Sequence, residues 1–203
     1  FFKDWIKLIV GGYNQAVKKE KTTEGRMFWY LVIATIPGGI IGLILDKFAG
    51  DVLKQPIIIG IALMVMGVIL YFVDKKSKST TNYENMSFKQ TFLIGLSQCL
   101  AFIPGVSRSG VTMTAGRAMG VDRESAAKYS FMLSAPIVFA ATIFKLKDFV
   151  FSIPFFVGIF ASFLVGIIVI KWLLKYLQRG SFKIFAVYRV IVGISIIIIS
   201  FIK

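Results

Sequence analysis

The chain has 203 residues, of which 57% are hydrophobic and 15% aromatic, and it carries a formal net charge of +14. Together with a mean hydropathy of +0.78, this composition excludes an ordinary soluble domain and indicates an integral membrane protein. The single cysteine, Cys99, excludes an internal disulfide, and the absence of histidine excludes a Ser-His-Asp triad built from this chain alone. The lysines lie beside apolar segments, so we expect no nucleic acid partner.

The N-terminal residues, Phe1–Leu8, lack the order of charged, apolar and small residues that marks a signal peptide. They are typical of the interfacial end of a helix, and we expect the chain to be an N-terminally truncated fragment. The next segment, Val10–Arg26, is predicted to be a polar loop, with Gly11 and Gly12 stopping the preceding helix.

Two uncharged segments follow, Met27–Leu45 and Gln55–Val73. At about 1.5 Å per residue, each is long enough to cross a bilayer core of about 30 Å. Pro56 suits the first turn of the second helix, where its missing N–H costs nothing. We expect a short exit loop over Asp46–Lys54 and a flexible soluble loop over Asp74–Ser87.

The C-terminal part of the sequence predicts three more spans. Asp122 is a candidate N-cap for a helix that runs to about Lys145, with a kink at Pro136. Phe149–Ile170 is free of charge, and a last helix is expected over Lys183–Phe201. The chain is therefore predicted to be an all-α, polytopic membrane protein, with five full spans in a single domain that covers residues 1–203.

One further apolar segment is predicted to be broken. Gln90–Ile103 is hydrophobic enough to enter a bilayer, but Pro104 and Gly105 then interrupt the helix, and a short helix resumes over Val111–Met119. If this segment enters and leaves on the same side, 17 lysines and arginines lie in the cytoplasmic regions and 5 on the opposite side. A full crossing would divide them 13 to 9, so the positive-inside rule favours a re-entrant segment.

The interrupting loop, Pro104–Thr112, places an arginine, three hydroxyls and two glycines among apolar residues. Free N–H groups at the start of the second helix, the helix dipole and Arg108 together suit an anion, above all a phosphate. Ser107, Ser109 and Thr112 could donate further hydrogen bonds to the same oxygens.

A polar loop with a surface arginine is the simpler alternative. At membrane depth, however, a charged Arg108 costs several kcal/mol unless a partner offsets it. All ten carboxylates fall in predicted loops or at span ends, so Arg108 must meet an anionic ligand or an acid elsewhere in the protein. Arg189 either snorkels or bridges two helices, or it supports the same site.

Three segments, in unbroken register, resemble the second signature region of the bacterial undecaprenyl-diphosphate phosphatases, which are also called bacitracin resistance proteins. They are Gly95–Gln98, Ile103–Thr112 and Ser125–Phe131. Weaker similarity at Ala34–Pro37 with Gly42–Leu43, and at Phe185–Arg189, extends the resemblance over most of the chain.

The resemblance implies a multi-pass protein of the bacterial plasma (inner) membrane that hydrolyses undecaprenyl diphosphate to undecaprenyl phosphate and inorganic phosphate. This reaction recycles the carrier lipid for peptidoglycan synthesis, and hence serves cell wall biogenesis, cell shape and resistance to bacitracin. The fold implied is an inverted repeat in which two re-entrant segments meet at a pocket, and this chain holds its larger C-terminal part. A homodimer is compatible with the resemblance.

By the resemblance, Arg108, Ser107 and Thr112 are the catalytic residues of this chain. Arg108 would neutralise the diphosphate, and the two hydroxyls would bind it through hydrogen bonds. The remaining residues expected to bind substrate are Gly105, Ser109, Gly110 and Arg189. A divalent cation, magnesium or calcium, is also implied, but its glutamate ligands and the nucleophile belong to an earlier signature that this sequence does not contain, so we expect no metal ligand here.

Two other classes of function stay open at this point. A membrane transporter or lipid-phosphate flippase also uses broken helices in inverted repeats. A non-catalytic membrane scaffold is disfavoured by the Ser107-Arg108-Ser109 sequence. Because the carboxylates of the family are missing, we expect the chain to be inactive when it is produced alone.

Overall fold

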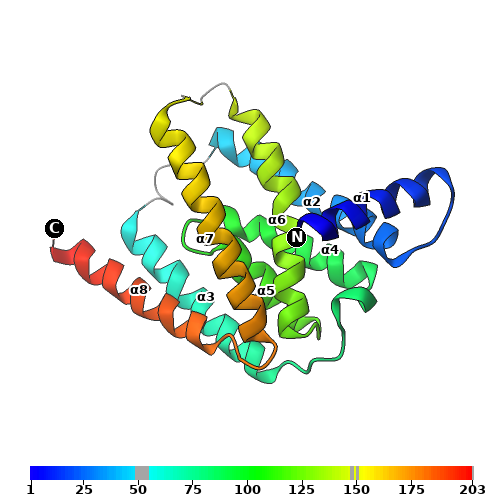
Figure 1. Ribbon diagram of the computed structural model, residues 1–203. Helices are drawn as coiled ribbons and strands as arrows, with labels where there is room; N and C mark the ends of the chain where they lie inside the picture. The colour runs from blue at the N-terminus through cyan, green and yellow to red at the C-terminus, as the bar shows by residue number, and fades with distance from the viewer. Residues whose placement is uncertain (49–54, 147–148, 150, 203) are drawn as a thin grey trace.

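The computed structural model describes residues 1–48, 55–146, 149 and 151–202, and only the backbone of 45–48. Its regular elements are all helical in these ranges, so the predicted all-α fold is confirmed (Figure 1). The α-helices are α1 (Phe2–Val17), α2 (Thr23–Phe48), α3 (Pro56–Lys76), α4 (Phe88–Ser97), α5 (Arg108–Ala118), α6 (Arg123–Phe144), α7 (Ile153–Leu177) and α8 (Lys183–Ile202). In the same ranges, the 3₁₀ helices are η2 (Tyr83–Asn85) and η3 (Gln98–Phe102).

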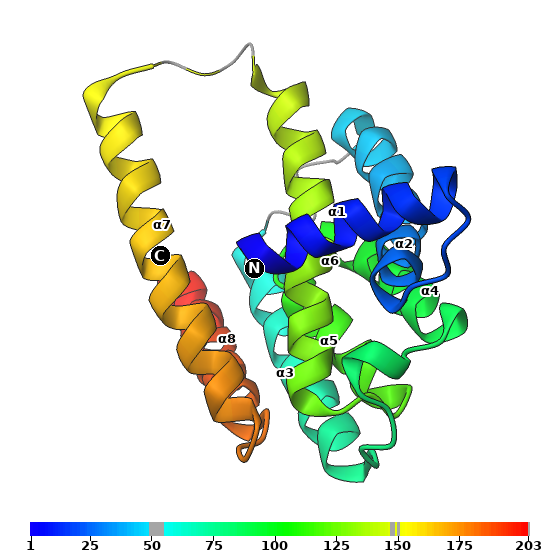
Figure 2. The ribbon, with the colours of Figure 1, turned by 45° about the vertical axis from the view of Figure 1, so that its right-hand side comes forward.

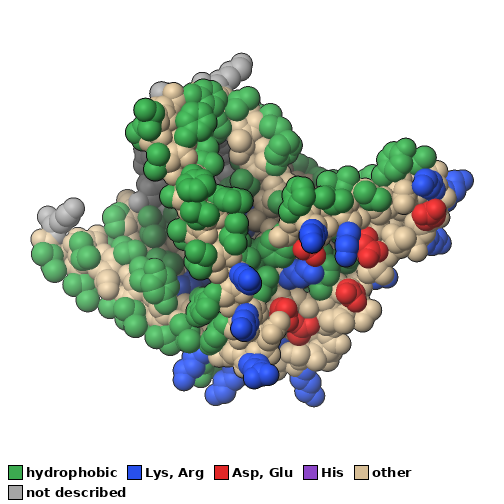
Figure 3. Space-filling view, in the orientation of Figure 1, with side chains coloured by type: hydrophobic (Ala, Val, Ile, Leu, Met, Phe, Trp, Pro, Cys, Tyr) green, Lys and Arg blue, Asp and Glu red, His purple; other side chains and the backbone are tan. Residues whose placement is uncertain are grey.

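Five of these helices, α2, α3, α6, α7 and α8, are long and apolar enough to cross a membrane. The five predicted spans are thereby confirmed. None of the side chains in the most apolar window of α7 is buried, and Figure 3 shows hydrophobic side chains covering the outside of the long helices. Such a surface suits hydrocarbon, where a helix satisfies its own backbone hydrogen bonds.

Local signals set most helix boundaries. Pro56 begins α3 as predicted, and Asp122 caps α6 by accepting a hydrogen bond from Ser125 N–H at 2.8 Å. Pro136 lies inside α6, where the kink stays a prediction. Helix α7 is displaced from the predicted Phe149–Ile170, because Ser152 caps its start and its last turns continue past the first lysine.

The prediction of a polar loop over Val10–Arg26 was wrong, since α1 runs to Val17 and α2 already begins at Thr23. The glycine pair does not stop α1. A Cβ on Gly11 would lie 2.7 Å from Gly25 N, so this glycine lets two helices pack backbone to backbone. Figure 2 shows α1 lying across the bundle.

The exit loop expected from Asp46 starts later, because α2 continues to Phe48, and residues 49–54 lie outside the described residues.

The flexible loop predicted over Asp74–Ser87 was also partly wrong. Asp74 lies in the last turn of α3 and is buried, with its carboxylate 2.8 Å from Arg117 Nε and 2.8 Å from Arg123 Nε. The same carboxylate accepts a hydrogen bond from Phe182 N–H at 3.1 Å. One side chain therefore joins α3 to α5, α6 and the start of α8, and it anchors the segment that follows.

The broken segment forms a hairpin of α4, η3 and α5. Gln90, near the start of α4, donates from Nε2 to the Met119 carbonyl oxygen just after α5, at 2.9 Å. Thr80 N–H donates to the Gly120 carbonyl oxygen at 2.9 Å, so both ends of the hairpin lie at the same end of the bundle. This arrangement is the hairpin that a re-entrant segment requires, and the side of the membrane from which it enters stays a prediction.

Candidate functional site at the broken helix

The site lies at the tip of the hairpin, between η3 and α5. Val106 N–H donates to the Ile103 carbonyl oxygen at 3.1 Å and closes a tight turn. Gly105 adopts φ +90°, in the left-handed region that glycine tolerates. A Cβ there would collide with the Ile59 carbonyl oxygen on α3, so the loop lies directly against that helix.

Ser107 ends the loop and caps α5, which begins at Arg108, three residues earlier than predicted. Its φ of +64° is rare for a residue with a Cβ and costs on the order of 1–3 kcal/mol. Ser107 Oγ accepts a hydrogen bond from Gly110 N–H at 3.3 Å and lies 3.5 Å from Ser109 Oγ. In the described part of the chain, the N–H groups of Arg108 and Ser109 have no hydrogen-bond acceptor. The start of α5 therefore offers free donors beside two hydroxyls.

Arg108 is half-buried at the first position of α5. Its Nη1 donates to the Ser134 carbonyl oxygen on α6 at 3.4 Å, which is a long and weak hydrogen bond. Arg108 takes part in none of the ion pairs found among the described residues. Most of its five N–H donors are therefore available to a ligand.

Arg189 reaches the loop from α8. Its Nη2 donates to the Gly105 carbonyl oxygen at 3.1 Å and to the Val106 carbonyl oxygen at 2.5 Å. A Cβ on Gly110 would collide with Arg189 Nη1, so the guanidinium lies against the first turn of α5. Arg189 is buried, and across the described ranges no carboxylate forms an ion pair with it. It therefore holds the loop in place and also adds an uncompensated positive charge.

Thr112 lies beneath the loop, on the buried side of α5. Its hydroxyl is 2.7 Å from Ser130 Oγ on α6 and 2.9 Å from the Arg108 carbonyl oxygen. The Thr112 side chain is 1% exposed, so it joins α5 to α6 and faces no open cavity. In this arrangement the Thr112 hydroxyl holds the first turn of α5 against α6, and its predicted hydrogen bond to the substrate stays a prediction.

A cavity of about 210 Å³ brings the polar groups together. Ser107, Ser109, Gly110 and Arg189 line its polar side, and its other walls are apolar or aromatic. Arg108, Gly105 and Thr112 are not among the described residues that line it. The apolar walls are Leu70, Met113, Phe131, Leu173, Phe182, Phe185 and Tyr188. Hydroxyls and a guanidinium beside an aromatic wall suit an anion that carries an apolar group.

Sequence reasoning missed Ser130 and the buried cluster around Asp74. Ser130 stood in one of the matching segments, but nothing in the pattern assigned it a partner. The partners of Asp74 lie more than forty residues away, so no local pattern could reveal them. Among the described residues, no group of three or more cysteine, aspartate or glutamate side chains lies close enough to hold a metal ion.

The comparison with known proteins gives one consistent result. The sequence pattern of the family described as Bacitracin resistance protein BacA matches residues 1–195. A protein of Pelotomaculum thermopropionicum named undecaprenyl-diphosphatase is 48% identical over 203 residues, covering 98% of this chain and 75% of the relative.

Two further relatives carry the same name. That of Desulforudis audaxviator is 39% identical and covers 100% of this chain and 77% of its own length. That of Gemmatimonas aurantiaca is 40% identical and covers 97% of this chain and 75% of its own length. The chain thus spans about three quarters of the relatives that it matches.

Proposed function

This chain belongs to the bacitracin resistance protein BacA family, and on that basis we propose that the α5 loop binds the diphosphate in an undecaprenyl-diphosphatase. The protein is a membrane-embedded hydrolase that acts on a lipid substrate. It cleaves undecaprenyl diphosphate with water, giving undecaprenyl phosphate and inorganic phosphate. No observation favours the alternative of a transporter or flippase.

The observation that carries the loop's role is a pair of arginines that have no carboxylate partner among the described residues. Arg108 and Arg189 flank the first turn of α5, where free N–H groups and the hydroxyls of Ser107 and Ser109 also lie. Burying a cation without a counter-charge costs several kcal/mol. A diphosphate supplies the missing negative charge, and its prenyl chain fits an aromatic wall.

The geometry suggests different roles for the two arginines. Arg108 makes one weak hydrogen bond, so it is free to grip two phosphate oxygens with its planar guanidinium. Arg189 already holds the Gly105 and Val106 carbonyl oxygens, and it positions the loop while its charge stabilises the anion. In phosphoryl transfer, negative charge spreads over the transferred group, so donors fixed in advance lower the barrier.

The described residues of the cavity do not fit a divalent cation. They offer hydroxyls and one guanidinium group and no carboxylate, whereas magnesium and calcium prefer several oxygen ligands with negative charge. A magnesium or calcium ion held by glutamates outside this sequence stays a prediction.

We also propose the bacterial plasma membrane as the location, because the five apolar helices fit a multi-pass protein and the resemblance is to bacterial enzymes. A homodimer is compatible with this placement. The absence of a nucleic acid partner stays a prediction, and it is supported by the position of the lysines at the ends of apolar helices.

The test is hydrolysis of a prenyl diphosphate by the complete protein, measured as release of inorganic phosphate. Arg108→Lys keeps the charge but can no longer bind two phosphate oxygens at once. Because a charge-assisted contact contributes about 1.5 to 3 kcal/mol, its loss from the transition state predicts a roughly ten- to hundredfold lower rate. Arg179→Lys, at an exposed position outside the cavity, is the matched control. A well-folded Arg108→Lys variant with a normal rate would refute the role given to this loop.

A further inference from the structure

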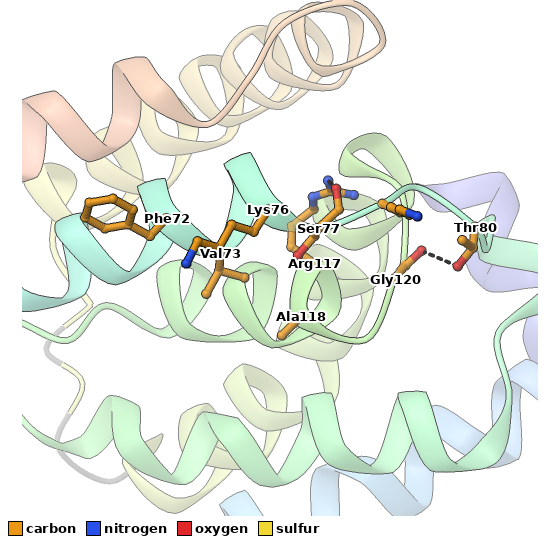
Figure 4. Close-up of a pocket in the computed structure, with 9 residues that line it drawn as sticks. Phe72, Val73, Lys76, Ser77, Thr80, Arg117, Ala118 and Gly120 are labelled. Carbon is orange, nitrogen blue, oxygen red and sulfur yellow. Dashed lines mark hydrogen bonds between the residues drawn. The ribbon is translucent and has the colours of Figure 1, made fainter.

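A second cavity lies away from the loop, where α3 and α5 end, and has a volume of about 550 Å³. Figure 4 shows Phe72, Val73 and Lys76 on α3, Ala118 near the end of α5, and Thr80 in the connecting segment. Ser77, Lys78, Arg117 and Gly120 complete the lining. The cavity is thus apolar along one part of α3 and cationic at the end of that helix.

Arg117 cannot serve a ligand in this cavity, because its donors are already used. Its Nε lies 2.8 Å from Asp74 Oδ1, and its Nη2 donates to the Ser77 carbonyl oxygen at 2.8 Å. Its Nη1 donates to the Val121 carbonyl oxygen at 2.7 Å and to Ser79 Oγ at 3.0 Å. Arg117 is therefore a structural residue in the floor of the cavity.

Lys76 and Lys78, in contrast, are exposed and take part in no hydrogen bond or ion pair with any other described residue. No carboxylate lines the cavity within the described ranges, and the nearby Asp74 is neutralised by two arginines. The carbonyl oxygens at the ends of α3 and α5 would repel an anion. Two of them are occupied, because Ser77 accepts from Arg117 and Gly120 accepts from Thr80.

An apolar groove of about 290 Å³ begins beside this cavity, and Phe72 lines both. The groove runs between α3 and α8, where Gly67, Val68, Ala186 and Val190 form its walls. Lys183 is the only charged residue among the described residues that line it. A cationic pocket and an apolar groove thus share one side chain.

We propose that this pair of cavities binds one anionic glycerophospholipid of the cytoplasmic leaflet. The phosphate lies between Lys76 and Lys78, and one acyl chain lies in the groove past Phe72. The proposal depends on the membrane location and not on the hydrolase activity.

The position in the bundle agrees with such a ligand. Figure 3 shows lysine and arginine side chains gathered along the lower edge, where α3 and α7 end in Figure 1. Phe182 N–H bonds to Asp74, so the loop before α8 shares this end with the segment that holds Lys78. Basic residues concentrate on the cytoplasmic side, where anionic lipids supply the complementary charge.

The test is a native mass spectrometry titration of the purified protein with phosphatidylglycerol, compared with phosphatidylcholine of the same chains. One basic residue at an anionic surface changes affinity about fivefold, so Lys76→Gln with Lys78→Gln should weaken phosphatidylglycerol binding about 20- to 30-fold. Lys18→Gln with Lys21→Gln removes the same charge at exposed positions outside the cavity, and should leave binding unchanged.

The groove is tested by Val68→Trp, which fills it, against Val65→Trp on an exposed part of α3 outside it. Only the first should weaken phosphatidylglycerol binding. Equal loss in the two lysine pairs, or equal binding of both lipids, would overturn the proposal. Displacement of the lipid by inorganic phosphate alone would assign the pocket to a free anion, and tighter binding of a polyprenyl phosphate would assign it to the reaction product.

Discussion

Gly110→Ala tests how the loop is held, because the change adds one methyl group at the contact between α5 and Arg189. The added Cβ would collide with Arg189 Nη1, which must then move. Moving it weakens the hydrogen bonds from Nη2 to the Gly105 and Val106 carbonyl oxygens. We expect a less stable protein and a slower enzyme, although alanine is the better helix former.

The magnitude follows from two opposing terms. Replacing glycine by alanine within a helix stabilises it by about 0.8 to 1.0 kcal/mol. Each hydrogen bond from a charged donor contributes about 1.5 to 3 kcal/mol, so the loss of one outweighs that gain. The free energy of unfolding should fall by about 0.5 to 2 kcal/mol, and the rate of diphosphate hydrolysis should fall with it.

Thermal melting and phosphate release from a prenyl diphosphate measure the two effects. Gly166→Ala on α7 is the matched control, because a Cβ there meets nothing within 4 Å, and it should leave both quantities unchanged or raise the stability slightly. In an Arg189→Ala background, Gly110→Ala should no longer destabilise the protein. A Gly110→Ala variant as active and as stable as the unmodified protein would refute this account of how Arg189 holds the loop.

Asp74→Asn removes the counter-charge of two arginines and should destabilise the protein by about 3 to 5 kcal/mol in thermal or denaturant unfolding. As a control, Asp4→Asn, which breaks the half-exposed pair with Lys128, should cost under about 1 kcal/mol. Thr112→Val keeps the volume but loses the hydrogen bonds of the hydroxyl to Ser130 Oγ and to the Arg108 carbonyl oxygen, so it should cost about 1 to 3 kcal/mol of stability and slow hydrolysis less than Arg108→Lys. The 203-residue chain produced alone should release no phosphate from a prenyl diphosphate above background, even when magnesium or calcium is supplied. Robust turnover would show that the carboxylates of this chain suffice for catalysis. Cysteines placed at Lys78 and at Arg179 should both resist a reagent added outside intact cells, and labelling of only one would contradict the re-entrant segment.

Much of the fold follows from local sequence. The starts of α3 and α6 were predicted, because Pro56 and Asp122 act on the backbone groups next to them. The break at Gly105 was predicted for the same reason. Gly11 shows the limit of such rules. Glycine can end a helix, as was predicted at Gly11, or it can let a second helix pack closely, as Gly11 does with Gly25. Only the packing of the neighbouring helix decides between these two outcomes.

The sequence by itself determined that five apolar helices are long enough to cross a membrane, that a further apolar segment is broken, and that Arg108 follows the break. These properties depend on hydropathy and backbone preferences over a few consecutive residues, which are present before the chain folds. The choice of the loop as the candidate site rested on the same local information.

The tertiary structure alone decided which groups meet at that loop. Arg189 bonds to Val106 across 83 positions of sequence, and Thr112 meets Ser130 on another helix. Asp74 is buried among partners 43 and 49 positions away. Such pairs form only when packed helices bring distant segments within about 3 Å, and hydrogen-bond geometry then selects one partner among many side chains of the same type.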